Sequence, residues 1–378
     1  INEWIPWLKQ PDRTSMLDRY ALLSLSCRRP GDLPDPSVTA DRPLLQYRLG
    51  ICAIAQRGLL DTVLAQSPRF AEAGFYVARY ETINRAVSGA QITRALPLLI
   101  AAHESIPESP VITVMLGNTW RSRNEYARAL ALYDEALARR TTQRDALLGR
   151  TAMLTYLGRA EDAIATATQM IELGTWYMGD AYYWRAWNLY NTTRLEAAAA
   201  DIVEAKKFQN SSDLLTLSGM VAYDQKRPMD AREDFQGALR LNDGNCPAIW
   251  YLGVLDLDLE ERRGGVPVDK RSWGQARDRF VTATDCYGKA AEAAREEAAR
   301  LPADLSPEAR TQQEPDYARR IADGLRQQAR SALNVALLSV QLGDRDRATQ
   351  FARIAVTHDF TRDRAQAVLD AALNSAAR

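Results

Sequence analysis

The sequence contains few of the residues on which catalysis and metal binding usually depend. Among its 378 residues are only two histidines, His103 and His358, and four cysteines, with no Cys-x-x-Cys pair. The local motifs of serine hydrolases, zinc proteases and phosphate-binding loops are all absent. We therefore expect a protein that is not an enzyme and that holds no metal and no cofactor.

An excess of positive charge and a long apolar run are also missing. Lys+Arg and Asp+Glu both number 48, so the chain has no net charge. This argues against nucleic acid as a partner, because nucleic-acid binding needs a basic face. No apolar run approaches the roughly 20 residues of a membrane-spanning helix, so we expect no membrane span within the chain.

What the sequence does contain is a spacing of small residues. The alanines at positions 129, 163, 198 and 231 each follow a turn-like tripeptide and open an apolar helical run, at separations of 34, 35 and 33 residues. A fixed step of this length, with two helices in each step, is typical of a solenoid that stacks helical pairs.

Helix packing residues recur with the same step. The third period has Leu116-Gly117 and Trp120 in its first helix and Ala129, Tyr133 and Ala136 in its second, and the sixth has Gly219, then Ala231, Phe235 and Ala238. On these residues the chain resembles the tetratricopeptide repeat (TPR) superfamily. The resemblance implies an all-α fold, a right-handed α-α superhelix (TPR solenoid) in which each repeat contributes a helix A and a helix B.

The regular step is broken near both ends, which predicts four segments. Residues 1–42 are not repeat-like and form an N-terminal helical cap, followed by the TPR solenoid over 43–286. The next alanine step, to Ala276, lengthens to 45 residues, with the added residues over 260–272 between the helices of that unit. The step to Ala348 lengthens to 72 residues, and its added residues predict a helical hairpin insertion over 287–330. Its second helix is expected to run from Glu314 to Leu342. Residues 331–378 form the last TPR unit and a capping helix over 362–377.

Two cysteines lie at matched ends of antiparallel helices. Cys246 starts the helix A and Cys286 ends the helix B of one unit, so a disulfide between them is geometrically allowed. Two partly buried free thiols are the alternative. A bridge would require an oxidising compartment, and the chain begins at Ile1 rather than Met. Both features favour an exported protein with its leader removed over a cytoplasmic one.

The resemblance also implies a ligand groove, because TPR proteins line their concave face with helix A. The positions that map to this face are Asn118, Arg121, Tyr156, Tyr183, Trp187, Tyr190, Met220, Tyr223 and Trp250. A ladder of aromatic rings with few cations suits an extended apolar or proline-containing peptide, or a glycan. The alternative is that many of these rings are helix–helix core.

The hypothesis that follows is a non-enzymatic scaffold or adaptor that binds a peptide segment of a partner protein in this groove. One alternative is a carbohydrate-facing adaptor of an envelope or polysaccharide-export system, with a glycan as ligand. The other is an accessory subunit that docks on an enzyme through the hairpin.

Overall fold

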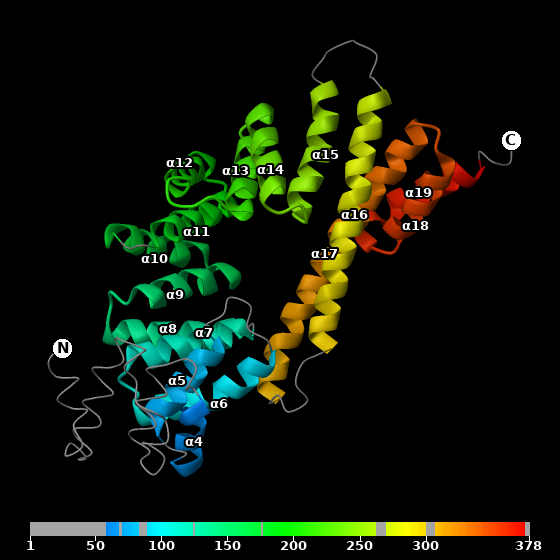
Figure 1. The fold of residues 1–378 in the computed structure, drawn as a ribbon. Coiled ribbons are helices and arrows are strands. Elements are labelled where there is room, and N and C mark those ends of the chain that lie inside the picture. The colour runs from blue at the N-terminus through cyan, green and yellow to red at the C-terminus, as the bar shows by residue number, and fades with distance from the viewer. Residues whose placement is uncertain are drawn as a thin grey trace, which may run out of the picture. The chain divides into compact units, whose positions relative to one another are not determined.

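The computed structural model describes residues 58–67, 70–82, 89–123, 125–174, 177–261, 270–299 and 307–374. All the regular structure in these ranges is α-helical and forms 16 helices (Figure 1). The all-α prediction is therefore confirmed. The predicted N-terminal cap over 1–42 lies outside the described residues. No helix within the described ranges is both long enough and apolar enough to cross a membrane.

Two compact units make up the chain, Ile1–Leu157 and Gly158–Arg378. The first unit contains α4 (Gly58–Gln66), α5 (Ala71–Thr82), α6 (Gly89–Ser105), α7 (Pro110–Ser122), α8 (Tyr126–Arg139) and α9 (Arg144–Tyr156). The second unit begins with α10 (Ala160–Glu172), α11 (Met178–Asn191), α12 (Leu195–Ala205), α13 (Ser212–Asp224) and α14 (Pro228–Leu241). It continues with α15 (Cys246–Glu261), α16 (Lys270–Ala299), α17 (Pro307–Gln341), α18 (Arg345–Val356) and α19 (Asp359–Asn374).

Helices A and B pack closely because glycine on one faces an aromatic ring on the other. A Cβ added to Gly219 of α13 would lie 2.7 Å from Cε1 of Phe235 on α14. In the first unit, a Cβ on Gly149 would lie 2.3 Å from Cζ of Tyr133, a contact that the repeat pattern did not predict. The rings of Tyr133 and Phe235 are fully buried. The small and aromatic positions that suggested the repeat, Gly117 with Tyr133 and Gly219 with Phe235, are therefore close contacts between helix A and helix B.

The turn from helix A to helix B is also repeated. The backbone angle φ is positive at three of these turns, at 61° for Thr193, 63° for Lys226 and 75° for Gly343. The next residue closes each of these turns with a backbone hydrogen bond of 2.8 Å to a carbonyl five residues earlier, from Arg194 to Leu189, from Arg227 to Ala222 and from Asp344 to Ser339. This Schellman-type closure ends helix A and lets helix B return antiparallel to it.

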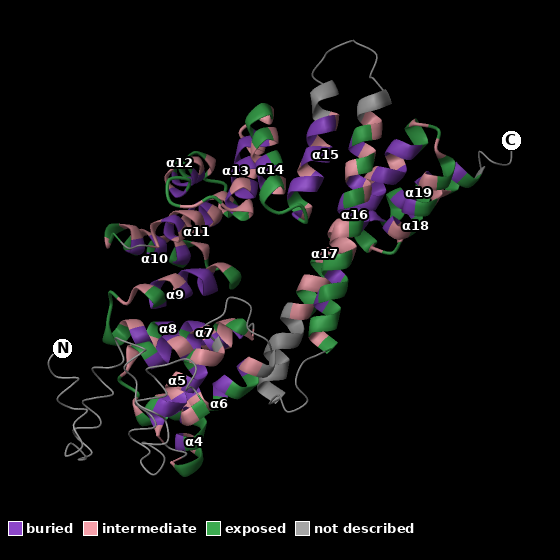
Figure 2. Ribbon diagram, in the orientation of Figure 1, coloured by how far each residue is buried: buried purple, intermediate pink, exposed green. Residues whose placement is uncertain are grey.

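The predicted helical hairpin is formed by α16 and α17, the two longest helices (Figure 1). They approach closely where a Cβ on Gly324 would lie 3.0 Å from Cβ of Ala291. α15 to α19 share one core around Phe280 and Leu333, seen as the buried stripes of these helices (Figure 2). α17 starts at Pro307, earlier than the predicted Glu314, since proline suits the first turn of a helix. The last helix starts at Asp359, three residues before the predicted start at 362, and its predicted end at 377 lies outside the described residues.

Candidate functional site

A pocket of about 580 Å³ opens on the face of the second unit that α11, α13, α15 and α17 form, here called the helix-A face. Three of these helices and α19 supply its walls. The lining residues are Tyr223, Asp224, Trp250, Tyr251, Val254, Arg330, Leu333, Asn334, Phe360, Thr361 and Arg364. Successive helices A lie side by side in such a stack of helix pairs, so residues more than a hundred positions apart meet in this pocket.

Tyr251 is the centre of an aromatic floor. Its ring stacks on Phe235, with centroids 4.9 Å apart and planes 10° apart. Tyr223 and Trp250 meet it edge-on, at centroid distances of 5.5 Å and 5.1 Å. Edge-to-face and offset-stacked pairs are favourable arrangements of aromatic quadrupoles, so the floor is a rigid surface before any ligand arrives.

A hydrogen-bonded group of two tyrosines and a carboxylate borders this floor. Tyr190 of α11 is hydrogen-bonded to both Asp224 and Tyr251. The carboxylate can only accept, so the Tyr190 hydroxyl donates to Asp224. Burial above all, and then the neighbouring Tyr251 and Asp224, raises the pKa of Tyr190. Burial likewise raises the pKa of Tyr251. Both phenols therefore stay neutral at physiological pH.

The opposite side of the pocket is cationic and partly apolar. The Arg330 guanidinium lies 4.2 Å from the centroid of the Trp250 ring, a cation–π contact. Arg330 and Arg364 are both exposed, and neither has a carboxylate partner among the described residues. Phe360, at the rim, is 70% exposed. The pocket therefore presents two guanidinium groups beside aromatic surface, and neither is in an ion pair with a described residue, while Asp224, the one carboxylate in the lining, is already engaged.

Three residues that the sequence assigns to the groove lie in the first unit. There Asn118 accepts a hydrogen bond of 2.7 Å from the Tyr133 hydroxyl, so it satisfies a buried phenol of helix B. Arg121 lies near enough to Tyr133 to influence its pKa, which burial raises to about 12. The Tyr156 ring stacks on Tyr126 of α8 with centroids 5.0 Å apart.

The other six residues assigned to the groove lie in the second unit. Tyr223 and Trp250 line the pocket, and Tyr190 reaches it through its hydrogen bonds. Trp250 is only 8% exposed, so its ring belongs to the core as well as to the pocket wall. Tyr183 and Trp187 pack partly buried against the α11–α13 core, and Met220 against the α13–α15 core. None of these last three lines the pocket.

Repeat mapping missed most of the polar side of the pocket. Tyr251 was overlooked because its neighbour Trp250 occupies the mapped position. Arg330 and Arg364 were overlooked because α17 and α19 carry no motif from which a repeat position could be counted. The signal that could have found Arg330 is its place on the second helix of the predicted hairpin, which returns beside α15.

Cys246 and Cys286 are joined by a disulfide that ties the start of α15 to α16. The described residues include no group of histidine, cysteine and acidic side chains that could hold a metal ion. His103 Nδ1 lies 3.3 Å from the Thr113 hydroxyl, and His103 Nε2 lies 3.3 Å from the Glu135 carboxylate. His358 Nδ1 accepts a hydrogen bond from the backbone N–H of Phe360 at the start of α19. Both histidines therefore have structural partners.

No protein-family model matches the sequence, and no curated protein matches it. Solved structures similar to the chain include the C-terminal part of a TPR repeat-containing protein from Cytophaga hutchinsonii, 12% identical with a TM-score of 0.48, over 79% of this chain and 99% of that one. PilF of Pseudomonas aeruginosa is 18% identical with a TM-score of 0.46, over 70% and 99%. YrrB, described as a TPR protein with an unusual peptide-binding site, is 16% identical with a TM-score of 0.41, over 50% and 95%. At these identities the likenesses concern the fold alone.

Proposed function

We propose that the chain, whose helix pairs stack as in a tetratricopeptide-repeat solenoid, is a non-enzymatic interaction scaffold whose helix-A pocket holds an extended segment of a partner protein. Solenoids of this kind expose a continuous surface of helices A and use it for binding. The observation that carries the proposal is an aromatic floor, Tyr223, Trp250 and Tyr251, beside two exposed arginines that have no carboxylate partner in the described part of the chain.

The chemistry of the lining indicates what such a segment contains. The aromatic floor and Phe360 favour an apolar, aromatic or proline side chain. Arg330 and Arg364 favour a carboxylate next to it, because a guanidinium binds a carboxylate through two parallel hydrogen bonds. The ligand expected for this pocket is thus an acidic segment with an apolar anchor, instead of the purely apolar or proline-containing peptide that the sequence suggested.

The test is a selection from a random peptide library on the whole chain, followed by measurement of affinities by fluorescence anisotropy. Selected peptides should share a carboxylate beside an apolar residue. Arg330→Gln and Phe360→Ala should each weaken binding by about tenfold or more, as expected for anchor residues. Both side chains are exposed, so neither change should lower the melting temperature noticeably.

The control is Leu373→Ala, which removes a half-exposed apolar side chain from the same helix as Phe360 but outside the pocket. It should leave the affinity unchanged. Peptides that bind the two pocket variants as well as the wild type would overturn the proposal. Competition by a soluble oligosaccharide but by no peptide would favour a glycan ligand for the same rings.

A further inference from the structure

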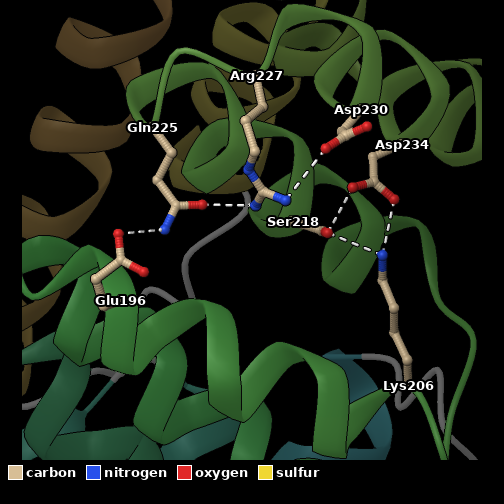
Figure 3. Close-up of polar contacts among 7 residues, drawn as sticks. All are labelled: Glu196, Lys206, Ser218, Gln225, Arg227, Asp230 and Asp234. Carbon is tan, nitrogen blue, oxygen red and sulfur yellow. Dashed lines mark hydrogen bonds and ion pairs between the residues drawn. The ribbon is translucent and has the colours of Figure 1, made fainter.

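The face formed by α10, α12 and α14, here called the helix-B face, carries a cleft of its own. It lies between α12 and α14 with α13 as its floor, and its volume is about 560 Å³ (Figure 3). At one end Lys206 Nζ donates to Asp234 at 2.8 Å and to Ser218 at 2.9 Å, and Ser218 Oγ donates to Asp234 at 2.5 Å. The two helices B are thus linked only by a flexible lysine at this end.

A second set of polar contacts borders the other end of the cleft. Gln225 donates to Glu196 at 3.0 Å and accepts from Arg227 at 2.6 Å, and Arg227 donates to Asp230 at 3.1 Å (Figure 3). Between the two ends the lining is apolar and includes Val203, which is 59% exposed. The cleft therefore has an apolar middle between polar ends.

The preceding repeat shows why the cleft is open at Ser218. Arg185 on α11 occupies the position that is equivalent to Ser218 one repeat earlier. Arg185 lies 16 residues before Asp201, which it contacts, and Ser218 lies 16 residues before Asp234, which it contacts. Arg185 spans its own gap. It donates to both oxygens of Asp201 at 2.7 Å and to Thr168 of α10 at 3.1 Å. A serine is too short to make these contacts, so the space between α12 and α14 stays unfilled.

The charge around the cleft suits a cation. Four carboxylates line it, those of Glu196, Asp230, Glu233 and Asp234, against the two cations Lys206 and Arg227. Glu233 is exposed and has no ion pair or hydrogen bond among the described residues. The local charge is therefore negative, although the whole chain is neutral.

We propose that this cleft binds an arginine side chain from a basic peptide segment, in the place that Arg185 occupies one repeat earlier. The guanidinium pairs with Asp234 and Ser218 and has Glu233 within the same lining, while the apolar stem lies along Val203. Lys206, whose side chain is 37% exposed, gives up Asp234 and returns to solvent. Arginine is favoured over lysine because its planar fork binds both carboxylate oxygens, as Arg185 does at Asp201.

The experiment uses the whole chain and a fluorescein-labelled peptide with three arginines spaced by glycine and serine. Fluorescence anisotropy should show saturable binding. The same peptide with citrulline, which has the shape of arginine without its charge, should bind roughly tenfold more weakly. Ser218→Arg places a guanidinium inside the cleft and should weaken binding of the arginine peptide by roughly tenfold, with an equal or higher melting temperature because the new side chain repeats the Arg185 contacts.

Gln236→Arg is the matched control, because it adds the same charge to α14 at an exposed position outside the cleft. It should leave binding nearly unchanged. Glu233→Gln provides a second variant with no expected effect on folding and should weaken binding several-fold. The proposal is overturned if the citrulline peptide binds as well as the arginine peptide, or if Ser218→Arg and Gln236→Arg weaken binding equally. Weaker binding in Phe360→Ala but not in Ser218→Arg would instead place the peptide against the aromatic surface of the helix-A pocket and would also overturn the proposal.

Discussion

At the scale of single residues, the turn at Thr193 carries measurable strain. Its φ of 61° lies in the left-handed region, where a β-branched residue is disfavoured by roughly 1–2 kcal/mol. Thr193→Gly should raise the free energy of unfolding by about 0.5–1 kcal/mol, because the greater freedom of glycine in the unfolded chain offsets part of the relief. Urea unfolding followed by circular dichroism measures this difference.

The neighbouring residue provides the control for that measurement. Thr192 has a φ of −97°, and its hydroxyl donates to the Asn188 carbonyl at 2.9 Å. Thr192→Gly relieves no strain and removes a hydrogen bond, so it should lower stability. If the two glycine substitutions changed the free energy of unfolding equally, strain from the left-handed backbone at Thr193 would not be what destabilises this turn.

At the scale of elements, the disulfide between Cys246 and Cys286 crosslinks α15 to the hairpin helix α16 across 40 residues of sequence. Closing a loop of this length in the unfolded chain corresponds to about 4 kcal/mol of stabilisation in the chain-entropy model. We expect reducing agent, or the double change of both cysteines to serine, to lower the free energy of unfolding by about 3–4 kcal/mol. Mass analysis under non-reducing conditions establishes the bond directly.

The double serine variant also serves as the control for reduction, since reducing agent should have no further effect on it. Alkylation of Cys246 and Cys286 in protein that was purified without reductant from an oxidising compartment would contradict the bond. It would also remove the disulfide as a reason to expect an oxidising compartment.

At the scale of the whole molecule, a solenoid is held together by contacts between neighbouring repeats. A chain that ends at Asp243 loses α15 to α19 but keeps every helix pair up to α13 and α14. We expect it to remain helical and to unfold cooperatively at a lower temperature, because Phe235 loses the ring of Tyr251 that covers it. Circular dichroism melts of the two chains test this. A truncated chain without helical signal would show that contacts between neighbouring repeats up to α14 are not sufficient for folding.

The neutrality of the whole chain hides two sites of opposite local charge in the second unit. The helix-A pocket presents Arg330 and Arg364, whereas the helix-B cleft presents Asp234 and the unpaired Glu233. A scaffold with these two sites would hold an acidic segment on one face and a basic segment on the other. The balanced composition of the whole chain says nothing about such local separation of charge.

The sequence by itself determined the helix pairs. Alanines such as Ala198 and Ala231, and the match between Gly219 and Phe235, are contacts within one repeat, so their spacing in the chain reflects their packing directly. The hairpin of α16 and α17 could be predicted for a similar reason, because the lengthened step has high helix propensity and one break.

Only the tertiary structure decided where ligands can bind. The helix-A pocket joins Tyr223, Trp250, Arg330 and Phe360, which come from four helices, and no fixed spacing relates them once the step is interrupted. The cleft at Ser218 is open because a serine stands where the preceding repeat has Arg185. The sequence alone does not show this, because only the structure shows that Arg185 spans the gap between α10 and α12. Repeat spacing specifies nearest-neighbour packing, whereas a site depends on which side chains remain unpaired after that packing is complete.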